Sequence, residues 1–105
     1  MSDKRKIQGL NEQGVDEAIV YTLDTANYPA GPVNAAAVTV KVYTDPARTD
    51  VTATVTSGAI VVVGRVITLP KISSLTADTN YRLEVKYTAT DGNVYEVWGI
   101  IPAEL

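Results

Sequence analysis

The chain has 105 residues, of which 46% are hydrophobic and 20% are charged, and its formal net charge at pH 7 is -3. These values are typical of one globular domain and exclude the weakly hydrophobic, highly charged composition of a disordered chain. The small negative charge disfavours nucleic acid and anionic membrane surfaces as partners. Cysteine and histidine are both absent, which excludes disulfides, thiolate nucleophiles, thiolate zinc sites and the usual general base. We therefore expect a non-enzymatic protein with no catalytic residue, metal, cofactor or small-molecule substrate.

The N-terminal segment, residues 1–15, is polar and is interrupted by two glycines. We expect it to be a flexible arm that precedes a single domain at residues 16–105. The segment lacks the apolar run of roughly 7 to 15 residues that a secretory signal needs, and no stretch reaches the ~20 apolar residues that cross a bilayer. We expect the protein to be cytoplasmic on synthesis, with the basic residues 4–6 as part of a solvated tail.

Two strands and a long loop are predicted for the first half of the chain. Residues 18–23 are rich in β-branched types, whereas residues 24–34 contain two prolines, a glycine and two asparagines. In residues 37–44, valines occupy positions 38, 40 and 42, and Thr39, Lys41 and Tyr43 alternate with them. This alternation is typical of a strand with one face in the core, and it ends at the turn residues Asp45 and Pro46.

Alternation continues through the middle of the chain. Residues 51–56 alternate Val, Ala and Val with three threonines, which predicts another strand. Residues 60–63 and 66–69 are short apolar runs on either side of Gly64 and Arg65, a pattern typical of a tight hairpin.

The last third of the chain has the clearest strand pattern. Apolar or aromatic residues at 81, 83, 85 and 87 alternate with polar ones, and Asp91-Gly92 predicts a hairpin turn into a strand at residues 94–101. A two-residue loop would pair Val85 with Trp98 and place the tryptophan over the core, whereas a three-residue loop would turn Trp98 outward. We expect the core position. Six residues are thus expected to form the core or the turn of this hairpin: Tyr81, Leu83, Val85, Trp98, Asp91 and Gly92.

About seven short strands and no convincing helix pattern predict an all-β antiparallel sandwich. Residues 75–83 combine an apolar residue, a turn and a tyrosine, Tyr81, at the start of a strand. This pattern resembles the tyrosine corner of immunoglobulin and fibronectin type III sandwiches, in which the tyrosine hydroxyl bonds to backbone a few residues upstream. The resemblance implies an immunoglobulin-like fold and a structural role for Tyr81.

A wider resemblance rests on residues 38–43, 50–55, 66–70 and 75–85. Together they resemble the small immunoglobulin-like accessory proteins encoded among the virion structural genes of tailed bacteriophages and prophages, over about residues 37–101. The resemblance implies a structural or assembly role through contacts with other phage structural proteins or through self-association. It carries no catalytic residues, and we expect a free edge strand to be one means of pairing.

The sequence is also compatible with other functions. One candidate interaction surface consists of outward polar and aromatic residues: Thr39, Lys41, Tyr43 and Tyr95. An alternative function is a carbohydrate-binding or adhesion module of fibronectin type III type, which would use exposed aromatics such as Tyr28 or an outward Trp98. A hydrolase built from carboxylates alone is disfavoured because such small sandwiches rarely hold a ligand-sized cleft. The acidic residues are interpreted as turn formers, since Asp bonds readily to turn backbone.

Overall fold

The computed structural model describes residues 7, 10, 12–25, 37–89 and 92–105. Most of the loop predicted at residues 24–34, including Tyr28, lies outside the described residues, as do Asp91 and the basic residues 4–6. In the described part, one short helix accompanies these strands: β1 (Gln13–Gly14), β2 (Thr22–Asp24), β3 (Ala37–Asp45), α1 (Thr52–Val55), β4 (Thr56–Ser57), β5 (Val61–Val63), β6 (Val66–Thr68), β7 (Lys71–Ile72), β8 (Asn80–Thr88) and β9 (Val94–Glu104). No helix among these residues has the length and apolar character needed to cross a membrane.

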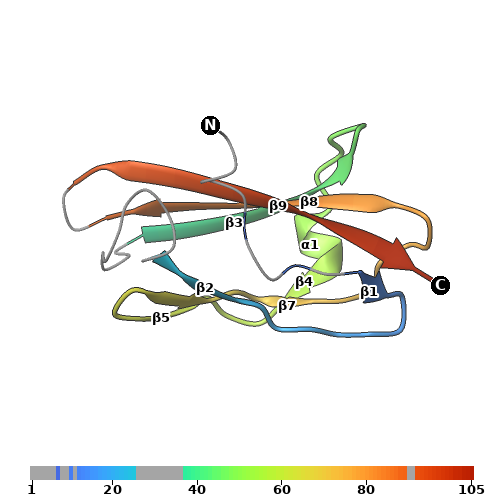
Figure 1. Ribbon diagram of the computed structural model, residues 1–105, viewed down its shortest axis with the longest axis horizontal. Coiled ribbons are helices and arrows are strands. Elements are labelled where there is room, and N and C mark those ends of the chain that lie inside the picture. Colours follow the sequence, from blue (N-terminus) through green and yellow to red (C-terminus); the bar gives the residue numbers. More distant parts are fainter. Residues whose placement is uncertain (1–6, 8–9, 11, 26–36, 90–91) are drawn as a thin grey trace.

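The strands form two layers with the core between them. One sheet has the order β1-β9-β8-β3, and the other layer contains the sheet β2-β6-β5 and the pair β4-β7. Figure 1 shows β3, β8 and β9 above β2, β4, β5 and β7. The two layers meet through side chains that are at most 1% exposed, which include Val42, Leu83, Val85, Val97, Leu23, Ile67 and Ile72. The prediction of an all-β, sandwich-like chain is confirmed, although β1 and β7 were not expected as strands.

The three long strands follow the predicted alternation. In β3, Val40 and Val42 are buried while Thr39 and Lys41 are exposed. In β8, the residues at 81, 83, 85 and 87 are all at most 3% exposed. The core positions predicted for Tyr81, Leu83 and Val85 are therefore confirmed, because a period of two sends alternate side chains to opposite faces.

The hairpin between β8 and β9 has the register that turns Trp98 outward. Val85 lies opposite Val97, and Glu84 lies opposite Trp98. The N–H of Ala89 donates to the carbonyl of Asn93 at 2.8 Å, so the hairpin loop between these two paired residues has three residues. The expectation that Trp98 covers the core is wrong, because one additional loop residue moves every side chain of β9 to the other face. Gly92 has a φ of 86° and occupies a turn, as predicted.

The strand predicted at residues 51–56 is also wrong. Residues 52–55 form the helix α1, and only Thr56 and Ser57 are extended as β4. The Asp50 carboxylate accepts hydrogen bonds from the backbone N–H of Thr52 at 3.0 Å and from its hydroxyl at 2.7 Å, which favours a turn at this point. Val51 and Val55 are four residues apart and pack on the same core, and this spacing fits one helical turn as well as it fits a strand.

The described residues of the N-terminal segment are held by the rest of the chain. Ile7 is 5% exposed, and its N–H donates to the carbonyl of Trp98. Gln13 is completely buried, and β1 pairs in parallel with β9 through Gln13 and Ala103. The side-chain amide of Gln13 donates to the carbonyl of Ile72 at 2.7 Å and thereby connects the two layers. The prediction of a flexible arm at residues 1–15 is wrong for this described part.

Two local predictions are confirmed by backbone and hydrogen-bond geometry. Val63 lies opposite Val66 at the end of the hairpin β5-β6, and Gly64 takes a φ of 58° that suits glycine. At the start of β8, Tyr81 is 3% exposed, and its hydroxyl accepts a hydrogen bond from the backbone N–H of Thr76 at 2.8 Å. The bond from a buried tyrosine to backbone five residues upstream is the one predicted from residues 75–83.

Candidate functional site

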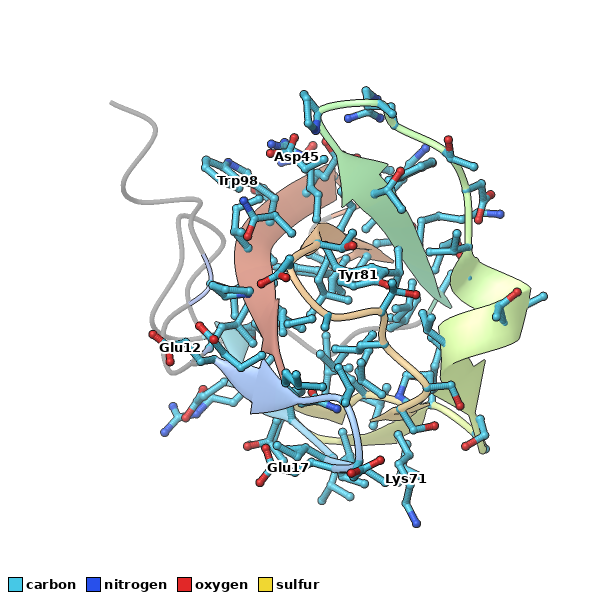
Figure 2. All side chains as sticks on the ribbon, turned by 90° about the vertical axis from the view of Figure 1, so that its right-hand side faces the viewer. Glu12, Glu17, Asp45, Lys71, Tyr81 and Trp98 are labelled. Carbon is cyan, nitrogen blue, oxygen red and sulfur yellow. The ribbon has the colours of Figure 1, made fainter. Side chains whose placement is uncertain are left out.

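The outer face of the sheet β3-β8-β9 carries polar and aromatic residues that could bind a partner. Because β3, β8 and β9 are in register, their outward residues form three rows across the sheet: Thr39-Lys86-Glu96, Lys41-Glu84-Trp98 and Tyr43-Arg82-Ile100. Figure 2 shows Trp98 on the outer side of β9, whereas Tyr81 lies between the two layers. Thr39, Lys41 and Tyr43 lie on this outer face, as predicted.

A shallow hollow of about 230 Å³ lies on this face. Its walls are polar, charged and aromatic: Thr39, Lys41, Tyr43, Glu84, Lys86 and Glu96. The three residues predicted from β3 are therefore joined by three from β8 and β9. Both signs of charge line the hollow, so it suits a polar group with mixed charge better than a simple anion or cation.

A cluster of arginine and aromatic side chains borders the hollow. We call Tyr43, Arg48, Arg82, Glu84 and Trp98 the arginine–aromatic cluster. The guanidinium carbon of Arg48 lies 4.6 Å from the centre of the Tyr43 ring, and that of Arg82 lies 4.3 Å from the Trp98 ring. Guanidinium groups at these distances are attracted to the electron-rich faces of the rings.

Glu84 connects the two halves of this cluster. Its Oε2 atom accepts hydrogen bonds from Arg82 Nε at 2.7 Å and from Arg48 Nη1 at 3.1 Å. The Glu84 side chain is only 12% exposed, whereas the Arg48 side chain is 54% exposed. Shared ion pairs to one partly buried carboxylate hold both guanidinium groups against their rings. The cluster is thus preorganised while part of it stays accessible to a partner.

Asp50 lies at the end of the same face, next to Lys41. The backbone N–H of Thr52, the Thr52 hydroxyl and, more weakly, the Lys41 ammonium hold the pKa of Asp50 below its ordinary value. Lys41 Nζ lies 3.8 Å from Asp50 Oδ2. Asp50 therefore stabilises the turn before α1 and forms an ion pair with Lys41. Within the described ranges, no group of three or more His, Cys, Asp or Glu side chains is placed to hold a metal ion.

Tyr95 does not belong to this face. It lies opposite Tyr87 in the ladder, with the two ring centres 6.0 Å apart, and it packs partly buried against the core. The expectation that Tyr95 joins the outward row is wrong for the same reason as for Trp98. In the observed register, odd-numbered residues of β9 face inward and even-numbered ones face outward.

Arg48, Arg82 and Glu84, which make the cluster distinctive, were not predicted from the sequence. Alternation along β8 places Arg82 and Glu84 on the outer face, but their contacts depend on the register of β9 and on the turn that carries Arg48. The comparisons with known proteins add no parallel for this site: no protein-family model matches the chain, and no curated protein or solved structure is significantly similar to it.

Proposed function

We propose that this protein is a non-enzymatic interaction protein of immunoglobulin-like fold, a structural or assembly component of a tailed phage or prophage particle that acts through protein–protein contacts. The observation that carries the proposal is the arginine–aromatic cluster on the outer face of β3-β8-β9. Tryptophan, tyrosine and arginine are the residues that contribute most binding energy at protein interfaces. Because Glu84 already orients both arginines, less side-chain entropy is lost on binding.

The order of the strands supports the immunoglobulin-like part of the proposal. If β2, β3, β5, β6, β8 and β9 are taken as strands B to G, the sheet β2-β6-β5 has the order B-E-D and the sheet β3-β8-β9 has the order C-F-G. Apart from β1, which pairs with β9 instead of β2, these are the sheet orders of constant-type immunoglobulin domains. The hydrogen bond to Tyr81 at the start of β8 adds the expected tyrosine corner at the start of strand F.

The resemblance of residues 37–101 to small immunoglobulin-like accessory proteins supports a place in a phage particle. The partners would be other virion structural proteins or further copies of this chain. Synthesis in the cytoplasm, where virions assemble, fits this role. The proposed contacts need no cofactor and no catalytic group.

The experiment is a binding measurement against the products of the neighbouring genes, among which the proposal expects capsid, connector or tail proteins. We expect at least one of them to bind the full chain, and we expect Trp98→Ala and Arg48→Ala each to weaken that binding at least tenfold. Lys71→Ala is the matched control, because Lys71 is exposed on β7 in the other layer. Equal binding by the cluster variants and the control, or binding to none of the virion proteins, would contradict the proposal.

A carbohydrate-binding or adhesion module is the second candidate function. The position of Trp98 on the outer face, together with the adjacent hollow, favours it, because sugar rings stack on exposed aromatic faces. However, the Arg82 guanidinium already covers one face of Trp98. A glycan titration followed by tryptophan fluorescence separates the two functions. If the protein binds sugars, Arg82→Ala should strengthen binding by freeing the ring, whereas it should weaken binding to a protein partner.

A further inference from the structure

The strand β5 is an edge of its layer and is apolar. Among the described strands it pairs only with β6, and residues 59–63 (Ala-Ile-Val-Val-Val) carry no charge. Val61 and Val63 point away from the core and are 50% and 72% exposed. Edge strands that stay unpaired are usually protected by charged residues or proline. Apart from its short length, β5 has neither protection.

The backbone of Val62 is directed toward the open side of β5. Thr25 N–H donates to the Arg65 carbonyl, and Leu69 N–H donates to the Tyr21 carbonyl, both at 2.9 Å, so odd-numbered residues along β6 bond to β2. Even-numbered residues of β6 therefore bond to β5, where their partners are Val63 and Val61. Since backbone groups alternate in direction along a strand, the N–H and carbonyl of Val62 face away from β6.

We propose that β5 pairs in antiparallel fashion with β5 of a second copy of this chain, around a two-fold axis at Val62. In this register the two Val62 backbones exchange two hydrogen bonds, and Val61 of each copy lies opposite Val63 of the other. The second layer then becomes one continuous sheet with the order β2-β6-β5-β5-β6-β2. The inference rests on the proposed function, because it specifies the self-association included there.

Self-complementarity identifies a second copy as the partner. The two-fold register places apolar residues opposite apolar residues and brings no like charges together. Arg65, the nearest cation in the sequence, forms an ion pair within its own copy, with Arg65 Nε 3.3 Å from Asp24 Oδ1. The edge strand of the other layer, β3, is less available for pairing with a second copy. Its Val42 N–H already donates to the Thr52 hydroxyl at 2.8 Å, and its Val42 carbonyl already accepts from the Val51 N–H at 2.9 Å.

The test is sedimentation of the full chain over concentrations from about 10 µM to 1 mM. We expect reversible doubling of the mass, with a dissociation constant on the order of 0.1 mM because the interface is small. Two double variants then test the register. V61K/V63K places like charges opposite each other across the two-fold axis and should be monomeric. V61K/V63E places a lysine of each copy opposite a glutamate of the other and should still dimerise.

Cysteine cross-linking gives a second measurement that changes the surface less. The chain has no cysteine, so Val61→Cys and Val63→Cys introduce one thiol each. Directly opposite residues can form a disulfide, so a mixture of the two variants should give a cross-linked dimer on oxidation, and Val61→Cys alone should not. A wild-type chain that stays monomeric at 1 mM, or the same mass for both charge variants, would overturn the proposal.

This result is separable from the test of the proposed function. The valines of β5 and the arginine–aromatic cluster lie in different layers. If the edge does not pair, V61K/V63K should still bind a virion protein through the cluster. If the cluster binds nothing, the wild-type chain should still dimerise through β5.

Discussion

The hydroxyl of Tyr81 is the atom whose removal best tests the predicted corner. Tyr81 is 3% exposed, and its hydroxyl oxygen accepts the backbone N–H of Thr76 at 2.8 Å. The change Tyr81→Phe keeps the buried ring and removes only this oxygen. The Thr76 N–H then loses its acceptor, while the packing of the core stays nearly the same.

The expected loss follows from this geometry. A hydrogen bond of this kind contributes about 1 kcal/mol net, and an N–H left completely dry would cost up to about 3 kcal/mol. Thr76 is exposed, so water can replace part of the lost acceptor. We therefore expect Tyr81→Phe to lower the free energy of unfolding by about 1 kcal/mol, which corresponds to a fall in Tm of about 4 to 8 °C for a chain of this size.

Urea unfolding and calorimetry measure this loss directly. The matched control is Tyr43→Phe, because the structure records no hydrogen bond from the Tyr43 hydroxyl to another described residue. The control should change the free energy of unfolding by less than about 0.5 kcal/mol. If Tyr81→Phe and Tyr43→Phe unfold at the same urea concentration, the hydroxyl does not stabilise the corner and the reasoning is refuted.

Three further changes test other parts of the structure. Gln13→Ala should lower the free energy of unfolding by about 1 to 3 kcal/mol in urea titrations. The buried side-chain amide of Gln13 donates a hydrogen bond to the carbonyl of Ile72 in β7 and accepts one from the Tyr21 hydroxyl. Gly99→Ala should lower the free energy of unfolding by about 1 kcal/mol, because the added Cβ lies 3.2 Å from the Ile7 Cβ and displaces the end of the flexible Leu10 side chain, and Leu10→Ala should recover part of this loss in a double-mutant cycle. Asp50→Asn should be less stable than the wild type at pH 6. This difference should shrink in melts at pH values below the ordinary pKa of an aspartate, because Thr52 lowers the pKa of the folded carboxyl and the stabilisation is lost as the pH falls through that lowered pKa.

Strict alternation made the long strands predictable. β3 and β8 each have nine residues, so a period of two is repeated often enough to identify both the strand and its buried face. The outward positions of Thr39, Lys41 and Tyr43 follow from that pattern alone. The tyrosine corner was predictable for a related reason, since its two partners are only five residues apart in sequence.

Short segments with distant partners were not predictable. The spacing of Val51 and Val55 fits a strand and a helical turn equally, and the side-chain bonds of Asp50 favour the turn. In the N-terminal segment, Gln13 bonds to the carbonyl of Ile72, which is 59 residues away. No local sequence pattern indicates a partner so far along the chain. The N-terminal segment was therefore predicted to be a flexible arm, although its described part belongs to the fold.

The arginine–aromatic cluster depends on the length of the loop between β8 and β9, and fluorescence of Trp98 tests this dependence. A loop one residue shorter would turn Trp98 into the core and Gly99 outward, and the stacking of Arg82 on Trp98 could not form. In the observed register, Trp98 is half-buried on the outer face. We therefore expect its fluorescence to be quenched by acrylamide in the native state, and we expect Arg82→Ala to increase quenching by exposing the ring. Blue-shifted emission that acrylamide leaves unchanged in both proteins would mean that Trp98 lies in the core, and the arginine–aromatic cluster would not exist.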